Sequence, residues 1–310
     1  MKNWYLFSGF VVVLLFQSCT KEVDIEVPAG EEKIVVEGFI ETGQPPIVIL
    51  TRNKPYFGTN NFNGLSDLIV KNAIVTVTNN GTTYTLLEIC TSTLPDSLLP
   101  LVTAITGIDS ATLASIDYCL YTTFDINAWG VEGEQYDLKV VAEGKTLTAS
   151  TEIPFAVALD SVWYKDQDPH TDRGFCWARL DDPDTIGNAY RWFAMRKGKD
   201  YGFLAPFGSA FEDKFINGQS FEFTAVRAHA SDDELEENAD YRGYFRTGDT
   251  IIVKFTTIDL PHYQFWRTYE TQVISNGNPF AAPAAVKSNI TGGLGIWGGY
   301  AVRYDTTVAQ

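Results

Sequence analysis

The stretch from Ile69 to Ile89, IVKNAIVTVTNNGTTYTLLEI, decides the fold class of this chain. Apolar and polar side chains alternate in its first half, which is the pattern of a strand with one buried face over residues 69–78. Asn79-Asn80-Gly81 follows with residues that adopt positive φ at little cost, and this indicates a hairpin turn. Residues 82–89 alternate again as the returning strand. The stretch therefore predicts an antiparallel β-hairpin.

Strand patterns of the same kind recur along the whole chain. They cover residues 33–40, 47–51, 134–141, 146–151, 160–164, 175–180, 190–195, 221–228, 251–258 and 295–303. Many short strands at this spacing are typical of β-sandwiches. Ile153-Pro154 divides them, because proline interrupts strand pairing and restricts the residue before it. We predict a mainly β chain with two Ig-like β-sandwich domains, residues 33–153 and residues 154–310.

Two segments depart from the strand pattern and predict helices. Residues 91–118 carry leucine, valine and isoleucine at helical spacing, with Gly107 as a stop, and indicate a small helical insert. Near the C-terminus, Pro261 suits a helix start, and aromatic residues then recur at helical spacing up to Asn276-Gly277. The second domain is therefore expected to contain one short helix.

The cysteines suggest one disulfide. Cys90 and Cys119 flank the helical insert, so they are the natural pair in an oxidising compartment. Closing a loop of about 28 residues would stabilise the fold by roughly 3 kcal/mol. Cys176 lies between two aromatic residues and is expected to be a small buried side chain.

The N-terminus has the features of an export signal. Lys2 precedes an apolar run, Trp4 to Phe16, that is shorter than the roughly 20 residues of a membrane-spanning helix. Residues 15–19, LFQSC, resemble the lipobox of bacterial lipoproteins, which implies cleavage after residue 18 and a diacylglycerol on Cys19. An ordinary secretory signal or an uncleaved membrane helix is the alternative. Residues 1–18 are thus a predicted signal peptide.

The residues after the lipobox suggest where the lipoprotein is exported. Lys21, Glu22 and Asp24 follow Cys19 within a short tether, residues 19–32. They resemble the signal that sends Bacteroidota lipoproteins to the outer face of the outer membrane. A solvated charged tether is the alternative interpretation. The resemblance predicts an outer-membrane protein that faces the cell exterior and can be labelled with palmitate.

Composition limits the function classes. The 310-residue chain carries a formal charge of −16, and 14% of its residues are aromatic. Such an acidic chain is repelled by nucleic-acid phosphates, so we exclude nucleic-acid binding. Its apolar content is high enough to bury a sizeable core.

Three further segments resemble one protein family. They are residues 50–57, LTRNKPYF, residues 278–283, NPFAAP, and residues 288–300, SNITGGLGIWGGY. Together with the anchor, they are similar to a Bacteroidota lipoprotein family known as domain of unknown function 4249. The resemblance covers nearly the whole mature chain. It implies a two-part β protein on the outer membrane and a partnership with a TonB-dependent receptor.

Candidate catalytic and metal-binding residues are sparse. The three histidines, His170, His229 and His262, lack the spacing of a zinc site, and no nucleophile elbow is present. Calcium could be bound by five aspartates that do not match an EF-hand loop, namely Asp166, Asp168, Asp181, Asp182 and Asp184. We predict no metal, no cofactor and no enzymatic activity.

Aromatic residues in loops are the remaining candidates for an interface. Aromatic side chains anchor protein contacts and stack on sugars, although they can equally cap the ends of a sandwich as core. The candidate residues are Tyr56, Phe57, Tyr201, Phe203, Phe207 and Trp297. The glycines around Trp297 are expected to permit tight turns and close backbone approach.

These features predict a non-enzymatic surface lipoprotein that binds a ligand as an accessory partner of a TonB-dependent outer-membrane transporter. Two alternatives remain open, a hydrolase of extracellular polymers and a structural or adhesion protein of the envelope.

Overall fold

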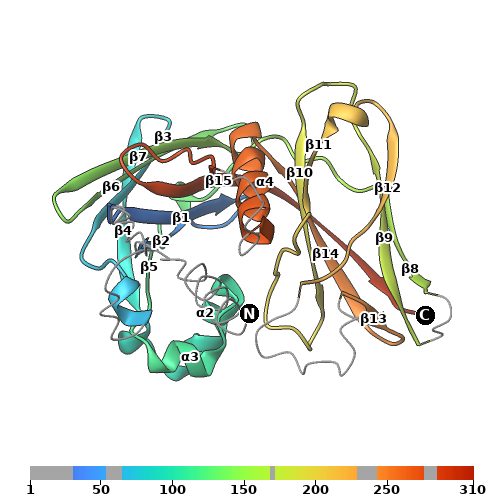
Figure 1. Ribbon diagram of the computed structural model, residues 1–310, viewed down its shortest axis with the longest axis horizontal. Helices are drawn as coiled ribbons and strands as arrows, with labels where there is room; N and C mark the ends of the chain where they lie inside the picture. Colours follow the sequence, from blue (N-terminus) through green and yellow to red (C-terminus); the bar gives the residue numbers. More distant parts are fainter. Residues whose placement is uncertain (1–30, 54–64, 168–171, 229–242, 276–284) are drawn as a thin grey trace, which may run out of the picture. The chain divides into compact units, whose positions relative to one another are not determined.

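The protein is mainly β in a computed structural model that describes residues 31–53, 65–167, 172–228, 243–275 and 285–310 (Figure 1). One compact unit comprises Glu32–Asn53 and Asn61–Gln310. All the helices and strands described below lie in this unit.

An 11-stranded sheet runs through the described part of the chain, in the order β11-β10-β14-β15-β1-β2-β5-β4-β3-β6-β7. Its strands are β1 Ile34–Glu41, β2 Ile47–Arg52, β3 Ile74–Asn79, β4 Thr82–Cys90, β5 Cys119–Thr122, β6 Gln135–Ala142, β7 Lys145–Glu152, β10 Ala189–Arg196, β11 Ala210–Glu212, β14 Thr250–Ile258 and β15 Leu294–Val308. A second sheet contains β8 Ser161–Asp166, β9 Arg173–Asp181, β12 Ser220–Thr224 and β13 Phe245–Arg246.

The predicted hairpin is confirmed, and the predicted strands of residues 134–141 and 146–151 form a second one. Strands β3 and β4 join at Asn80 and Gly81, whose φ values are 48° and 79°. Strands β6 and β7 join at Glu143 and Gly144, with φ values of 52° and 72°. Two consecutive positive φ values match the right-handed twist of the paired strands. Strand β3 begins at Ile74 instead of the predicted residue 69, because the backbone at Asn72 has a φ of 58° and interrupts the extended chain.

The C-terminal strand β15 joins the two halves of the long sheet. It pairs in parallel with β1, where Gly38 lies opposite Trp297, and in antiparallel with β14. The N-terminal core lies between β1, β2 and β15 on one side and β3, β6 and β7 on the other (Figure 1). Trp297 is fully buried in this core, and its indole Nε1 donates to the carbonyl of Tyr136 at 2.9 Å.

The second core lies between the two sheets. Strands β10 and β14 contribute Tyr190, Trp192 and Phe255 to it, and the second sheet contributes Ala178 and Phe223. Aromatic rings contact one another across this core, for example Trp192 and Phe223 with centroids 5.1 Å apart. The first core thus lies between two parts of the 11-stranded sheet and the second lies between two sheets, and apolar clusters between facing β layers are expected of β-sandwiches.

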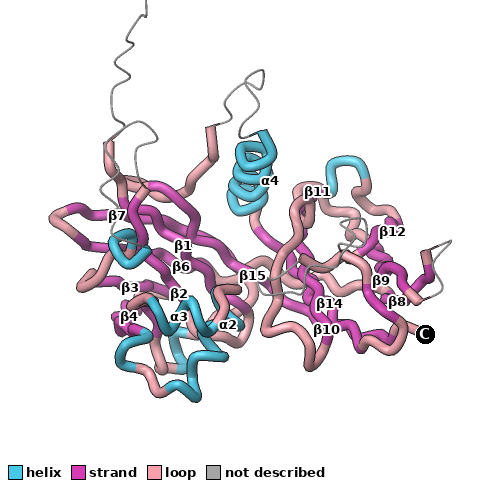
Figure 2. Tube along the Cα trace, turned by 60° about the horizontal axis from the view of Figure 1, so that its bottom comes forward, coloured by secondary structure: helices cyan, strands magenta, loops and turns pink. Residues whose placement is uncertain are grey.

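The predicted helical insert is present. It contains the 3-10 turns η2 Thr91–Thr93 and η3 Asp96–Leu98, followed by α2 Leu99–Thr106 and α3 Ser110–Ser115, which lie beside each other (Figure 2). Gly107 ends α2 in the left-handed conformation, and Asp109 caps α3 by accepting from the backbone N–H of Thr112 at 2.8 Å.

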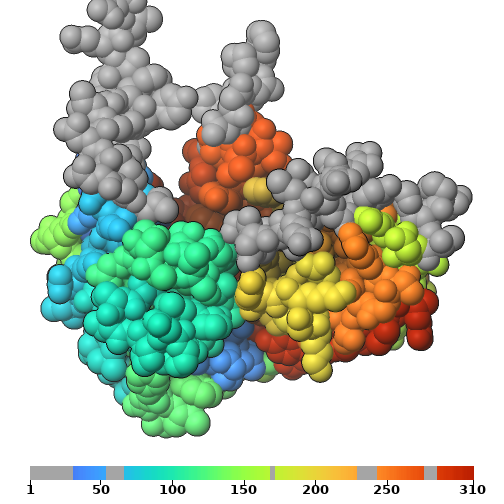
Figure 3. All heavy atoms as spheres, turned by 90° about the horizontal axis from the view of Figure 1, so that it is seen from below, coloured from blue at the N-terminus to red at the C-terminus, as the bar shows by residue number. Residues whose placement is uncertain are grey.

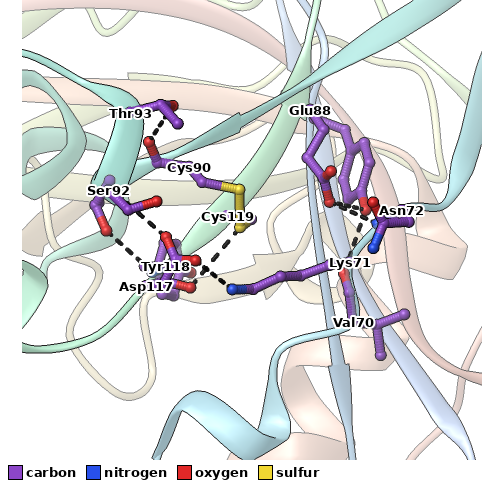
Figure 4. Close-up of a disulfide and its surroundings, with 12 residues drawn as sticks. Val70, Lys71, Asn72, Glu88, Cys90, Ser92, Thr93, Asp117, Tyr118 and Cys119 are labelled. Carbon is purple, nitrogen blue, oxygen red and sulfur yellow. Dashed lines mark hydrogen bonds and ion pairs between the residues drawn. A yellow bond between two sulfur atoms is a disulfide. The ribbon is translucent and has the colours of Figure 1, made fainter.

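The insert is fastened at its base by a disulfide between Cys90 and Cys119 (Figure 4). These cysteines are the last residue of β4 and the first residue of β5, so the bond closes the insert where it leaves the sheet. Nearby, Lys71 forms an ion pair with Asp117, whose carboxylate also accepts from the backbone N–H of Ser92.

The predicted C-terminal helix is α4, Leu260–Ser275. Asp259 caps it, because its carboxylate accepts from the backbone N–H of His262 at 2.8 Å. The buried face of α4 packs against β10, β11 and β15, and its Tyr263 belongs to the apolar cluster there. The helix thereby brings His262 onto the central strands of the long sheet.

Candidate functional site

A cavity of about 1270 Å³ opens over the central strands of the long sheet. It is somewhat larger than the roughly 300–1,000 Å³ of common small-molecule sites. Its floor comes from β1, β10, β14 and β15, and its walls come from α2, α4 and the loop of residues 201–207. The floor of the cavity therefore depends on the pairing of β15 with β1 and β14, which joins strands that are far apart in the sequence.

The walls are apolar. Helix α2 contributes Leu101 and Ile105, and Leu101 is 60% exposed. The loop contributes Tyr201, Phe203 and Phe207, of which Phe207 is also 60% exposed. Apolar side chains that remain accessible around a cavity are typical of ligand-binding sites.

Helix α2 and the loop of residues 201–207 meet at the edge of the cavity through two glycines. A Cβ atom on Gly107 would lie 2.5 Å from Leu204 Cδ2, and one on Gly202 would lie 2.5 Å from the carbonyl oxygen of Ala104. Figure 3 shows the insert (green) and the segment around residue 205 (yellow) side by side on one face of the protein. This contact brings the insert to the cavity wall.

Alternation along β1 explains how one strand serves both the core and the cavity. Val36 and Ile40 are buried in the N-terminal core, whereas Glu37, Phe39 and Glu41 point to the opposite face and line the cavity. On β15, the same face carries Ile296 and Tyr300, which lie opposite Glu37 and Glu41.

Strands β10 and β14 alternate in the same way. Tyr190 and Trp192 belong to the second core, and Arg191 and Phe193 line the cavity. On β14, Phe255 belongs to the core and Lys254 to the cavity. Two cations therefore lie on the floor of a largely apolar cavity.

Lys254 has a charged partner inside the cavity. Lys254 is 7% exposed, and its ammonium group forms an ion pair with Glu41. Its Nζ also lies 4.9 Å from the centroid of the Phe193 ring and 5.8 Å from that of Phe203. The charge of Lys254 is thus compensated within the protein.

Arg191 is held by aromatic rings and a hydroxyl group, and not by an ion pair within the described residues. Its guanidinium Cζ lies 3.5 Å from the centroid of the Trp266 ring and 5.1 Å from that of Phe193. Nη1 donates to the hydroxyl of Tyr300 at 3.0 Å, and Nε is buried without a hydrogen-bond partner in the described residues. Although Arg191 is only 6% exposed, the one hydrogen bond of its side chain among these residues goes to a neutral phenol.

The carboxylates of Glu37 and Glu270 interact electrostatically with the Arg191 guanidinium but do not form ion pairs with it among the described residues. Water reaches Glu37 in the cavity, yet the surrounding protein desolvates its carboxylate and raises its pKa, and Arg191 only partly offsets this. Burial also raises the pKa of Glu270 on α4, against the smaller effects of the Gly208 N–H and Arg191. Neither forms an ion pair within 4.0 Å of Arg191 among the described residues.

His262 completes the floor of the cavity. Burial and the charge of Arg191 lower its pKa to about 3, so the imidazole is neutral at physiological pH. Its Nδ1 lies 3.3 Å from the carbonyl oxygen of Gly299, which can only accept, so Nδ1 carries the proton. The ring also contacts Tyr300, with centroids 4.5 Å apart.

The residues predicted from sequence divide into three groups. Tyr201, Phe203 and Phe207 are brought together at the cavity. The prediction that Trp297 belongs to an interface is wrong, because its indole is 0% exposed and packs over Gly38. The others, namely Cys19, Lys21, Glu22, Asp24, Tyr56 and Phe57, lie outside the described residues.

Sequence reasoning missed the charged floor of the cavity. Arg191 stands in the apolar strand AYRWFAMR, and Lys254 stands in TIIVKFTTI. A charged residue in the middle of a buried strand is rare unless it is paired or functional, and this was the available signal.

The described residues offer one group of three potential metal ligands, Glu88, Cys90 and Cys119, and both of its sulfurs are used in the disulfide. Asp182, one of the aspartates considered for calcium, accepts hydrogen bonds from Tyr190 Oη at 2.5 Å and from the backbone N–H of Gly218 at 3.1 Å. These contacts give Asp182 a structural role. Asp168, His170 and His229 lie outside the described residues.

Comparison with protein-family models gives a match over most of the chain. The family model described as domain of unknown function (DUF4249) matches residues 20–306. The chain belongs to this family. A comparison with curated proteins found no match. This DUF4249 protein has no helix, among its described residues, that is long and apolar enough to cross a membrane.

Proposed function

We propose that this DUF4249 protein is a non-enzymatic ligand-binding lipoprotein, anchored through Cys19 to the outer membrane and facing the cell exterior. Its ligand is a small molecule with an apolar body. The observation that carries this proposal is the cavity of about 1270 Å³, with apolar walls and a few charged groups on its floor. Convergent polar groups in an apolar cavity are the usual design of a binding site.

The residues around the cavity favour binding over catalysis. The neutral imidazole of His262 bonds to a backbone carbonyl and packs on Tyr300, and Lys254 is paired with Glu41. These contacts hold both side chains in place. An array of fixed groups under apolar walls supports recognition of a bound molecule.

We further propose that the protein delivers or presents its ligand to a TonB-dependent transporter in the same membrane. Support comes from the export signal expected in residues 1–24 and from the apolar residues accessible at the cavity, such as Phe207. Large exposed aromatic side chains commonly anchor protein interfaces.

The ligand is tested by purifying the full chain from outer membranes and analysing organic extracts by mass spectrometry. We expect a small molecule to co-purify with the wild type and with Ile126→Glu, and to be lost from Leu101→Glu. Leu101 lines the cavity and is 60% exposed, whereas Ile126 is 69% exposed and lies outside it. Extracts that do not differ between the two variants would contradict binding in the cavity.

The partner and the anchor have separate tests. Affinity capture from solubilised outer membranes is expected to recover a TonB-dependent receptor, and recovery of none would contradict the partnership. Replacing Phe207 with alanine should weaken capture more than Phe215→Ala, because Phe215 is 83% exposed but lies away from the cavity. Palmitate labelling should disappear in Cys19→Ala, and a retained label would refute the anchor.

A further inference from the structure

The two cations on the floor of the cavity, Arg191 and Lys254, have different partners. Lys254 forms an ion pair with Glu41, so its charge is matched inside the protein. Arg191 is buried to a similar degree, but it has no carboxylate within ion-pair distance among the described residues. A buried charge is stable only when it is paired and hydrogen-bonded. Among the described residues, Arg191 is therefore the cation of the cavity floor that lacks a counter-ion.

Arg191 is also prepared for an incoming anion. Its guanidinium lies against the Trp266 ring, and its Nη1 is held by the hydroxyl of Tyr300 at 3.0 Å. These contacts fix the orientation of the forked set of N–H donors of the guanidinium, and Nε has no hydrogen-bond partner in the described residues. A guanidinium fixed in this way recognises a planar oxyanion through parallel N–H donors.

The surrounding charges favour a monoanion. Arg227 also lines the cavity, where it forms an ion pair with Asp200 at 4.0 Å. Arg191 therefore offers a single positive charge, because Lys254 is compensated by Glu41 and His262 is neutral. Glu37 and Glu270 are close enough to interact electrostatically with Arg191. A phosphate monoester carries about −1.5 to −2 charge at pH 7 and would be repelled by these carboxylates. A carboxylate carries one charge and matches the guanidinium.

We propose that a molecule with one carboxylate and an apolar body binds in the cavity with its carboxylate on Arg191. The apolar body lies against Leu101, Ile105 and Phe203 of the walls. This assignment rests on the proposed ligand-binding function and names the chemical class of the ligand.

Four probes with the same eight-carbon chain test the head group. Octanoate, octyl phosphate, octan-1-ol and octylamine are titrated into the full-length protein in lipid nanodiscs, with empty nanodiscs as the blank. We expect octanoate to bind at least about tenfold more tightly than each of the others, the gain expected from a charge-assisted hydrogen bond. Equal or tighter binding of octan-1-ol or octylamine would overturn the assignment. Tighter binding of octyl phosphate would replace the carboxylate with a phosphate.

Variants of the cavity cations test which side chain binds the carboxylate of octanoate. Arg191→Gln should weaken octanoate at least about tenfold and leave octan-1-ol unchanged. Arg191→Lys keeps the charge without the fork, so it should lie between the wild type and Arg191→Gln. Arg179→Gln is the matched control, because Arg179 is an exposed arginine paired with Glu222 outside the cavity. If Lys254→Gln weakens octanoate as much as Arg191→Gln does, the carboxylate is not on Arg191.

The outcomes separate this inference from the proposed function. Binding of octan-1-ol without any preference for octanoate would retain an apolar ligand site and reject the carboxylate. Binding of none of the four probes would reject the carboxylate class. The co-purification experiment with Leu101→Glu would then decide separately whether the cavity holds a ligand at all.

Discussion

The imidazole of His262 lies directly over the backbone of Gly298. A Cβ atom at position 298 would come within 2.3 Å of His262 Cε1 and within 2.5 Å of its Nε2. Gly298 is buried on β15 between Trp297, which points into the N-terminal core, and Gly299, which accepts from His262. The absence of a side chain at this position is what allows α4 to bring His262 onto the sheet.

Gly298→Ala is therefore expected to destabilise the protein by about 1–3 kcal/mol, as overpacking of a buried site usually does. The displaced atoms are those of His262, so the cost should be much smaller in a His262→Ala background. A double-mutant cycle by chemical denaturation measures this coupling. Equal costs in both backgrounds would show that the strain lies elsewhere.

The same histidine predicts a pH dependence of stability. The pKa of His262 is about 3 in the folded protein, against an ordinary value of 6.5. The unfolded chain therefore binds the proton first, and His262 lowers stability as the pH falls from about 6.5 towards 3. The slope from this one group is at most about 1.4 kcal/mol per pH unit.

Glu37 and Glu270 act in the opposite sense, because their pKa values are raised in the folded protein. The contribution of His262 is therefore isolated by comparing wild type with His262→Gln between pH 7 and pH 4. The difference between their free energies of unfolding should change across this range in the direction that relatively favours His262→Gln at low pH. A constant difference would contradict a neutral buried His262.

Local sequence rules predicted most of the elements of the fold. The turns at Asn80-Gly81 and Glu143-Gly144 require positive φ, and only a few residue types accept it at little cost, so the hairpins can be read from single positions. Helix α4 and the insert follow from apolar residues at helical spacing, and the insert's flanking cysteines form the disulfide found in the structure.

Long-range pairing escaped prediction. The parallel pairing of β1 with β15 joins residues more than 250 positions apart, and no local pattern encodes it. This pairing places Glu37 beside Ile296 and Glu41 beside Tyr300, and the pairings of β14 and β10 bring Lys254 and Arg191 to the same face. Trp297 was misassigned for the same reason, because its burial depends on Gly38 of a distant strand.

The disulfide should contribute measurably to stability. Cys90 and Cys119 are 29 positions apart, and removing both with alanine is expected to lower the free energy of unfolding by roughly 3 kcal/mol. The denaturation midpoint of the wild type should fall in reductant, and that of the double variant should not. Cys176→Ala keeps the disulfide and serves as the control, since Cys176 is a buried free thiol. A wild-type midpoint that is insensitive to reductant would contradict this contribution.

The thiol of Cys176 should resist alkylation. Burial raises its pKa to about 12, and the thiolate is the reactive form. Iodoacetamide at pH 8 is expected to label this cysteine only after the protein is unfolded. Mass spectrometry of the labelled peptide measures the rate with and without denaturant. Equal rates would show that Cys176 is accessible in the folded protein.

The pair of Lys254 and Glu41 should be costly to break from one side. Side-chain exposures are 8% for Lys254 and 14% for Glu41, so Glu41→Gln would leave an ammonium group buried without its counter-ion. Losing one partner of a buried pair usually costs about 3–5 kcal/mol, whereas replacing both is often nearly neutral. Glu41→Gln should therefore destabilise the protein far more than the double variant Glu41→Gln with Lys254→Met.

Arg179 and Glu222 provide the matched control for this pair, because both side chains are more than 40% exposed. Glu222→Gln should change the free energy of unfolding by less than about 1 kcal/mol, since solvent screens an exposed ion pair. Chemical denaturation of the four variants compares the two pairs. Similar costs for Glu41→Gln and Glu222→Gln would mean that water reaches Lys254 in the cavity. In that case burial could not distinguish Lys254 from Arg191 as the cation that accepts a ligand carboxylate.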